Sequence, residues 1–136
     1  MAVYKFKLQG ILDIKDKLET QAKQEFANAN LKLLEEEALL EDIKRRIVDY
    51  VDEGVRLRET IIDPVAIEHN KFAIEMMEYA MKAQEREVNV ARRNVDIARK
   101  KMMDARMETR TFERLKEEDF ERFMKAEGMA ESKEID

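Results

Sequence analysis

The chain has 136 residues, of which 42% are charged and 44% apolar, with one proline, three glycines and no cysteine. Ordinary domains carry roughly 25% charged residues, and packing so many charges into a compact core would leave some of them unpaired at high cost. The composition excludes disulfide frameworks and thiolate metal sites, contains no apolar run near the roughly 18 residues of a membrane span, and favours charged helices with a narrow apolar seam.

The first predicted element is a helix over about 5–59. Apolar residues recur there mostly at steps of three, four or seven, which places them on one helix face. Lys15 and Glu36 fall on the same stripe, and polar residues in a seam cost stability but fix the register. Gly54 either costs this helix about 1 kcal/mol relative to alanine or caps it. We expect the helix to continue to about 59, because the apolar residues after Gly54 would otherwise be exposed in a loop.

Pro64 lies near the middle of the chain and predicts a turn. A proline disrupts a helix interior because it lacks the amide hydrogen and clashes with the preceding turn. It is favoured at the first helical position, here with Asp63 as the N-cap. We therefore predict a turn at about 60–63 and a second helix that folds back. The expected fold class is all-α, a long antiparallel two-helix coiled-coil hairpin that forms one domain over 1–136.

The second helix is predicted over about 64–127, followed by a frayed tail at 128–136 that begins with Gly128. Its apolar residues again recur at steps of three and four, with one phase shift near 86–91, and such shifts locally unwind a coiled coil. The predicted stripe consists of Phe72, Met76, Tyr79, Ala83, then Val90 or Ala91, Val95, Ala98, Met102, Ala105, Phe112, Leu115, Phe120 and Phe123.

The second predicted helix is longer than the first, so it should extend beyond its partner by about two turns. The extension would carry Phe120, Phe123 and Met124. Two interpretations stay open for this stripe. It is a docking surface, since an apolar stripe without a partner helix marks one, or residues 1–7 extend alongside and cover it.

Catalytic residue types are scarce, and a coiled coil offers no cavity for a substrate. His69 is the one histidine, so Ser-His-Asp and Cys-His arrangements cannot form, and we expect it to be a solvated or capping side chain. Glu35, Glu36 and Glu37 are consecutive on a helix and point to different faces, so they cannot chelate one metal together. We predict no enzymatic activity, no cofactor, no metal and no small-molecule substrate.

Residues 82–110 form a basic band, with nine basic and five acidic side chains and thus a net charge of +4 (9 − 5). Nucleic-acid binding is one interpretation. Acidic residues are interleaved, however, and the band has no aromatic side chains for base stacking, so we expect no nucleic-acid partner. Eight of the nine methionines lie in the second half. They either form an adaptable binding surface or fill gaps in the seam.

The two ends of the chain resemble those of FliJ proteins. The opening phrase Tyr4-Lys5-Phe6-Lys7-Leu8-Gln9 and the charged helix that follows match the start of that family, and the lysine- and glutamate-rich segments 113–118 and 131–136 match its closing phrases. The resemblance implies a non-enzymatic stalk and escort of the flagellar type III protein export apparatus, cytoplasmic and peripheral to the membrane. The implied partners are the hexameric export ATPase, the export-gate membrane protein FlhA and export chaperones.

The resemblance also suggests two sets of partner-binding residues. At the ATPase end they are Phe6, Leu8, Leu12, Phe120 and Phe123. The gate surface of the family has the pattern Phe-x3-Leu-x2-Ala-x3-His, which falls here on Phe72, Met76, Tyr79 and Ala83; the phenylalanine matches, methionine is a fair substitute, and the last two depart. The facing residues on the first helix would be Leu39, Ile43, Arg46 and Tyr50. A role in the seam explains the gate-surface residues equally well without any partner.

Two other functions stay open. Two hairpins could pair into a four-helix bundle, a homo-oligomeric scaffold that would dimerise with increasing concentration. A helical-hairpin holding chaperone would use the methionines and would suppress aggregation of unrelated proteins. Neither the oligomeric state nor the choice between a flagellar and an injectisome system follows from the sequence.

Overall fold

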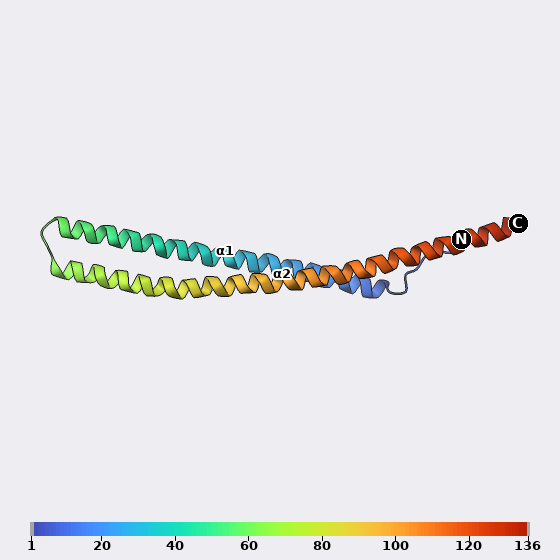
Figure 1. Ribbon diagram of the computed structural model, residues 1–136, viewed down its shortest axis with the longest axis horizontal. Helices are drawn as coiled ribbons and strands as arrows, with labels where there is room; N and C mark the ends of the chain where they lie inside the picture. The colour runs from blue at the N-terminus through green and yellow to red at the C-terminus, as the bar shows by residue number, and fades with distance from the viewer. Residues whose placement is uncertain (1, 136) are drawn as a thin grey trace. The chain divides into compact units, whose positions relative to one another are not determined.

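The computed structural model describes residues 2–135, with side chains described as far as residue 132. It contains two helices, α1 (Gln9–Glu59) and α2 (Pro64–Ile135), which pack against each other (Figure 1). No strand occurs in residues 2–135. The predicted fold class, an all-α helical hairpin, is confirmed. Neither helix combines the length and apolarity that a membrane span requires over the described residues.

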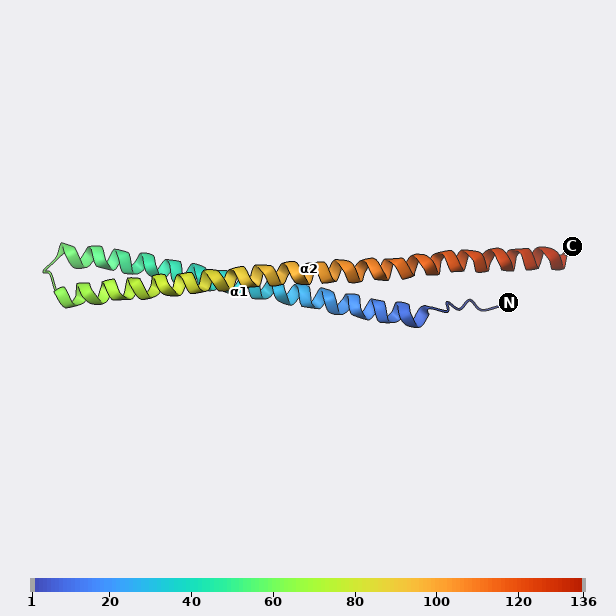
Figure 2. The same ribbon diagram turned by 60° about the horizontal axis from the view of Figure 1, so that its bottom comes forward.

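Contacts divide the chain into two units. Unit 1 consists of Met1–Phe26 and Ala98–Asp136, and unit 2 of Ala27–Ile97. Unit 1 places the start of α1, and the non-helical segment before it, beside the C-terminal part of α2 (Figure 2). Unit 2 holds the turn and the two helical segments that it joins. The organisation as a single domain stays a prediction.

The turn occupies residues 60–63, at the place where Pro64 predicted it. Asp63 caps α2, since its Oδ1 accepts hydrogen bonds from the amides of Val65 at 3.0 Å and Ala66 at 3.4 Å. These bonds satisfy amides that have no partner in the first helical turn. Pro64 is the first residue of α2, where its missing amide hydrogen costs nothing.

Both outer helix ends differ from the predicted ones. α1 begins at Gln9 rather than at about residue 5, because residues 4–8 line a groove against α2 instead of continuing the helix. α2 continues through Gly128 to Ile135, past the predicted end at 127. Gly128 does not adopt the left-handed conformation of a helix cap, and the methionine, alanine, glutamate and lysine after it favour helix. Asp136 lies outside the described residues.

The seam of α1 alternates steps of three and four without interruption, as in a heptad repeat. Ile11 and Leu18 are apolar but exposed, whereas Lys15, which the spacing placed on the predicted stripe, lies in the seam together with Glu19 and Gly54. The residues at these buried or half-buried positions are Leu12, Lys15, Glu19, Ala22, Phe26, Ala29, Leu33, Glu36, Leu40, Ile43, Ile47, Tyr50, Gly54 and Leu57.

The seam of α2 has the same uninterrupted alternation, so the phase shift predicted near 86–91 is wrong. That shift arose from assigning Phe72, Met76 and Tyr79 to the seam, although they are 64%, 48% and 69% exposed. The true seam in this stretch has no aromatic side chain and includes the polar residues Asn70 and Gln84, so a search for the bulkiest apolar side chains overlooks it. Its buried or half-buried members are Ile67, Asn70, Ile74, Met77, Met81, Gln84, Val88, Ala91, Val95, Ala98, Met102, Ala105, Thr109, Phe112, Lys116, Asp119 and Phe123.

Polar residues of the two seams are matched within unit 2. Gln84 Nε2 donates to the Glu36 carbonyl oxygen at 3.0 Å and also to the Glu36 carboxylate. Lys32 Nζ lies 2.9 Å from the same carboxylate. The Lys32 hydrogen bond, followed by that of Gln84, lowers the pKa of Glu36 below its ordinary value. Because a slipped register would bury these groups unpaired, the match favours one register.

Gly54 is a close-packing position rather than a break in α1. Asn70 crosses over it and donates from Nδ2 to the Tyr50 carbonyl oxygen at 2.8 Å. A Cβ at position 54 would lie 2.6 Å from Asn70 Oδ1. The glycine therefore makes room for the polar side chain of the facing helix.

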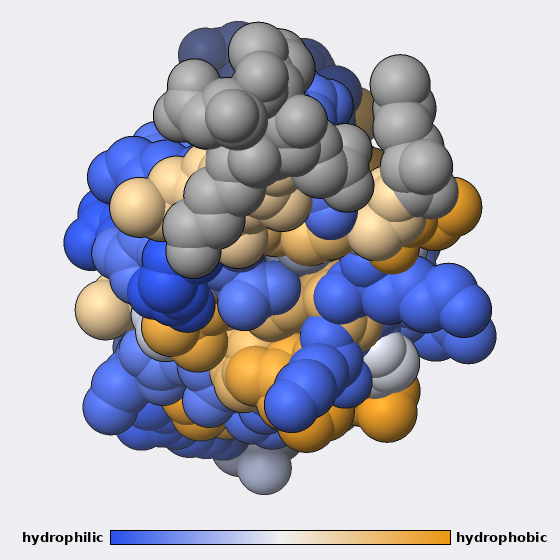
Figure 3. Space-filling model, turned by 90° about the vertical axis from the view of Figure 1, so that its right-hand side faces the viewer, coloured by the Kyte–Doolittle hydropathy of each residue, from blue (hydrophilic) through white to orange (hydrophobic). Residues whose placement is uncertain are grey.

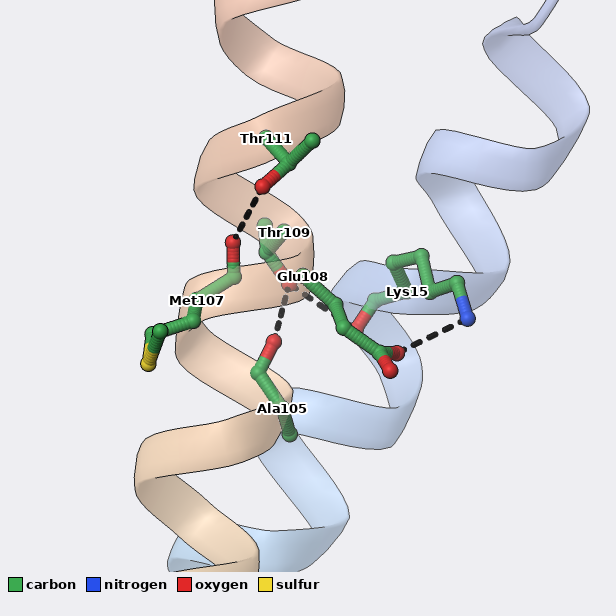
Figure 4. A network of polar contacts seen from close by, with 6 residues as sticks. All are labelled: Lys15, Ala105, Met107, Glu108, Thr109 and Thr111. Atoms are coloured by element: carbon green, nitrogen blue, oxygen red, sulfur yellow. Dashed lines mark hydrogen bonds and ion pairs between the residues drawn. The ribbon is translucent and has the colours of Figure 1, made fainter.

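Unit 1 has a corresponding polar layer around Thr109 (Figure 4). The Thr109 hydroxyl is buried, with the Lys15 carbonyl oxygen at 3.2 Å and that of Ala105 at 3.1 Å. Lys15 Nζ forms an ion pair with Glu108 Oε2 at 2.8 Å. The lysine that falls on the predicted stripe thus turns its ammonium group outward and its backbone toward the threonine.

Candidate partner-binding surfaces

An open groove of about 630 Å³ lies in unit 1, between the segment before α1 and the C-terminal part of α2. We call it the terminal groove. Viewed from the right-hand end of Figure 1, the surface has hydrophobic side chains directly beside hydrophilic ones (Figure 3). The residues that line the terminal groove are Tyr4, Lys5, Phe6, Lys7, Leu8, Leu115, Asp119, Arg122 and Phe123.

Tyr4 anchors one wall of the terminal groove to α2. Its ring centroid lies 5.1 Å from that of Phe120, edge-on, and 5.3 Å from that of Phe123. Its hydroxyl donates to Asp119 Oδ2 at 3.0 Å, with the Lys116 carbonyl oxygen at 3.3 Å. Burial of the phenol, then the hydrogen bond to Asp119, raises the pKa of Tyr4. Aromatic pairs of this geometry contribute about 0.5–1.5 kcal/mol beyond area burial, so they hold the segment in place.

The segment before α1 covers part of the apolar stripe at 120–124, which agrees in part with the second of the two interpretations left open for it. The segment before α1 lies against Phe123, which is half-buried. Phe120 is still 45% exposed beside Tyr4, and Met124 is also exposed. The covered stripe and the cover together form one mixed apolar and charged surface.

A second apolar surface lies on unit 2, on the side of α2 that faces away from its seam. Phe72, Met76 and Tyr79 follow one another at steps of four and three, so they share one helix face, and all three are exposed. Ala83, four residues later, is half-buried. We call these four residues the outer stripe. A seam role does not explain its three large members, because the seam lies elsewhere on α2.

Neither surface carries the elements of a catalytic or metal centre. Within the described part of the chain, no group of three or more histidine, cysteine, aspartate or glutamate side chains is arranged to hold a metal ion. His69 is exposed near the start of α2. Both surfaces are suited to non-covalent binding of a partner protein, because they combine aromatic or thioether side chains with charged side chains around them.

The family model for the flagellar FliJ protein matches residues 4–136, nearly the whole chain. The chain belongs to the FliJ family. It is therefore a non-catalytic coiled-coil component of the flagellar export apparatus, as the resemblance at the two chain ends implied. Searches of the curated proteins and of the solved structures gave no match. Family membership settles the choice between a flagellar and an injectisome system in favour of the flagellum.

In this FliJ-family protein, most of the residues predicted for the ATPase end come together. Phe6, Leu8 and Phe123 line the terminal groove, and Phe120 packs against Tyr4 at its side. Leu12 differs, because it is 4% exposed in the seam and its side chain is closed to a partner. Tyr4, Leu115 and Arg122 also line the terminal groove, although the sequence did not predict a binding role for them. The opening phrase contained Tyr4, but its pairing with residues more than a hundred positions away had no local signal.

The residues predicted for the gate surface of this FliJ-family protein divide between surface and seam. Leu39 and Arg46 on α1 are exposed, and Arg46 Nε lies 3.1 Å from Asp42 Oδ2. Ile43 and Tyr50 are half-buried seam residues. Three further apolar side chains on α1 are exposed and share much of one helix face, namely Val48, Val51 and Val55.

Proposed function

We propose that this FliJ-family protein is a stalk and escort that binds the hexameric export ATPase through the terminal groove and the export gate, FlhA, through the outer stripe. It works in the cytoplasm, at the membrane-embedded export apparatus, and also handles export chaperones. It performs no chemistry itself. The observation that carries the proposal is the exposure of Phe72, Met76 and Tyr79 on one face of α2.

That exposure supports a binding role because it lacks an internal explanation. Three large apolar side chains at helical spacing usually point into a core, and here the seam occupies the other side of the helix. Contiguous exposed apolar side chains mark interaction sites on soluble proteins. The residues also fall on the family pattern that implies contact with the gate.

The terminal groove supports the ATPase contact by its composition. Its lining combines aromatic rings and leucines with the cationic side chains of Lys5, Lys7 and Arg122. Arg122 Nη2 lies 3.6 Å from Asp119 Oδ1, and the other oxygen of this carboxylate accepts the hydrogen bond from the Tyr4 hydroxyl. A surface with aromatic anchors and a charged rim is the usual anatomy of a protein interface.

The mechanism is differential binding. A stalk that binds the assembled ATPase ring more tightly than its subunits shifts the assembly equilibrium by that preference and no more. ATP hydrolysis is stimulated in this way when the assembled ring is the more active form and the groove fits the ring better than it fits single subunits.

Two double variants test the assignment and serve as each other's control. Phe120→Ser with Phe123→Ser should abolish stimulation of ATP hydrolysis by the export ATPase and leave binding to the cytoplasmic part of the gate protein unchanged. Phe72→Ser with Tyr79→Ser should do the reverse. Far-UV circular dichroism must show that both keep their helicity. Loss of both activities in either variant, or of neither, would contradict the proposed division.

Light scattering on the wild-type chain tests the alternative of a homo-oligomeric scaffold. A monomer at high micromolar concentration is expected. A dimer that dissociates on dilution, and that the Phe72 and Tyr79 changes prevent, would assign the outer stripe to self-association instead.

A further inference from the structure

The outer stripe continues along α2 beyond Ala83, toward the end of unit 2. Each further member lies two residues after a seam residue, so it is about 200° around the helix, nearly opposite the seam. Steps of three and four alternate without interruption, as they do in the seam itself. We call the whole set the extended stripe; it comprises Phe72, Met76, Tyr79, Ala83, Arg86, Val90, Arg93 and Ile97.

The added members are exposed and mix two chemistries. Val90 is 40% and Ile97 55% exposed, and both continue the apolar row. Arg86 and Arg93 are exposed as well. Among the described residues neither arginine has an ion pair, whereas the neighbouring Arg92 reaches Glu37 across to α1 at 3.8 Å. No carboxylate belongs to the extended stripe.

We infer that the extended stripe binds an amphipathic α-helix of a partner protein, one with apolar residues at heptad spacing and carboxylates opposite Arg86 and Arg93. A row of exposed apolar residues with heptad spacing is the pattern that a second helix packs against. The two arginines favour a partner helix with acidic side chains, since guanidinium groups pair bidentately with carboxylates. The inference rests on the proposed gate contact at Phe72–Ala83 and adds the chemistry of the segment that docks there.

An anionic membrane surface fits the extended stripe less well. Exposed carboxylates flank it on both sides, with Glu75 and Glu78 next to its apolar part and Glu85 and Glu87 on either side of Arg86. A flat anionic surface would approach these carboxylates together with the arginines, and like charges would oppose binding. A helix touches only a narrow row of residues and leaves the flanking carboxylates in water.

A second copy of the chain also fits less well. If two copies met through this same stripe, four arginines and no carboxylate would enter the interface. Unpaired cations in a closed interface are costly. Charge complementarity therefore favours a different, acidic partner helix.

Two designed 28-residue helical peptides provide the probe. Both carry leucine at heptad spacing; one carries glutamate beside the leucines and the other lysine at the same positions. Fluorescence anisotropy with the full chain should show the glutamate peptide binding about tenfold more tightly than the lysine peptide, which corresponds to about two favourable surface ion pairs. Arg86→Glu with Arg93→Glu should invert the preference. Arg110→Glu with Arg114→Glu, which makes the same charge change in unit 1, should leave it in place.

Equal binding of the two peptides, binding of neither, or an unchanged preference in the Arg86 and Arg93 variant would overturn the inference. Two other results would also overturn it, provided that neither peptide is preferred. One is binding to phosphatidylserine vesicles that Arg86→Glu with Arg93→Glu abolishes, and the other is dimerisation that the same variant abolishes.

Gate binding separates this inference from the proposed function. If Phe72→Ser with Tyr79→Ser abolishes binding to the gate protein and Arg86→Glu with Arg93→Glu does not weaken it, the gate contact stands and the acidic helix is wrong. If the wild-type chain prefers the glutamate peptide but does not bind the gate protein, the stripe has the inferred specificity and the gate is the wrong partner.

Discussion

Asn70 of α2 fills the space that a side chain at position 54 of α1 would need. Its Oδ1 lies 2.6 Å from where a Cβ on Gly54 would stand, and its Nδ2 is bonded to the Tyr50 carbonyl oxygen. This pair explains why a glycine persists inside a 51-residue helix. The gap left by the glycine admits a buried amide from the facing helix, and that amide specifies the register of unit 2.

Gly54→Ala should therefore destabilise the protein by about 1–2 kcal/mol, although alanine alone would favour the helix by about 1 kcal/mol. The added methyl group forces Asn70 to rotate away from the Tyr50 carbonyl. Urea unfolding followed by circular dichroism measures the change. Combining Gly54→Ala with Asn70→Ala should recover part of the loss; a single variant more stable than wild type would show that close packing does not control this position.

Glu36 makes stability depend on pH in the acid range. Its pKa is lowered by hydrogen bonds from Lys32 and Gln84, so the folded state binds the proton less readily than the unfolded state. The stabilising contribution is complete above the ordinary pKa of a glutamate and is lost as the pH falls through the lowered, folded-state value. Urea unfolding between pH 7 and 3 should show a steeper loss for wild type than for Glu36→Gln. Parallel curves for the two proteins would contradict this assignment.

Thr109 offers a matched comparison with Thr111 on the same helix (Figure 4). Both hydroxyls bond a carbonyl four residues earlier, but Thr109 is buried against Lys15 of α1 and Thr111 is exposed. Thr109→Val keeps the shape and removes the hydroxyl, which should cost about 0.5–1.5 kcal/mol. Thr111→Val should change the free energy of unfolding by less than about 0.5 kcal/mol. Equal effects would mean that the bond toward α1 adds nothing.

Tyr4 should control how firmly the segment before α1 is held. Tyr4→Phe keeps the ring contacts and loses the hydrogen bond to Asp119, so trypsin should cleave after Lys5 or Lys7 roughly two- to tenfold faster. Tyr4→Ala also loses the contacts with Phe120 and Phe123 and should be cleaved faster still. Cleavage at the wild-type rate in both variants would show that Tyr4 does not hold this segment.

The raised pKa of Tyr4 gives a second readout of the same contact. Because the folded state favours the neutral phenol, the Tyr4 contribution to stability is present below the ordinary tyrosine pKa and is lost as the pH rises through the folded-state value. Ultraviolet difference titration of wild type against Tyr4→Phe should place this ionisation above that of an exposed tyrosine. Replacing Asp119 with asparagine should bring it down.

The sequence by itself determined the helical fold, the turn before Pro64 and the family. These features follow from local rules: an aspartate cap followed by proline favours the start of a helix, and the opening phrase is contiguous. Most of the α1 seam was also predictable, because its bulky residues point inward. Lys15 and Glu36 were placed on that seam from spacing alone.

Only the tertiary structure decided which face of α2 is the seam in unit 2 and what covers the end of unit 1. Two rows of residues, one beginning at Asn70 and the other at Phe72, repeat at the same spacing two positions apart. The aromatic side chains of Phe72 and Tyr79 favour the second row, and the polar side chains of Asn70 and Gln84 argue against the first. The row with Asn70 and Gln84 is buried because the facing helix matches both polar side chains. Asn70 meets the Tyr50 carbonyl and the gap at Gly54, and Gln84 meets the Glu36 carboxylate. Such pairings join residues that are distant in the chain, so the periodicity of either helix alone does not reveal them.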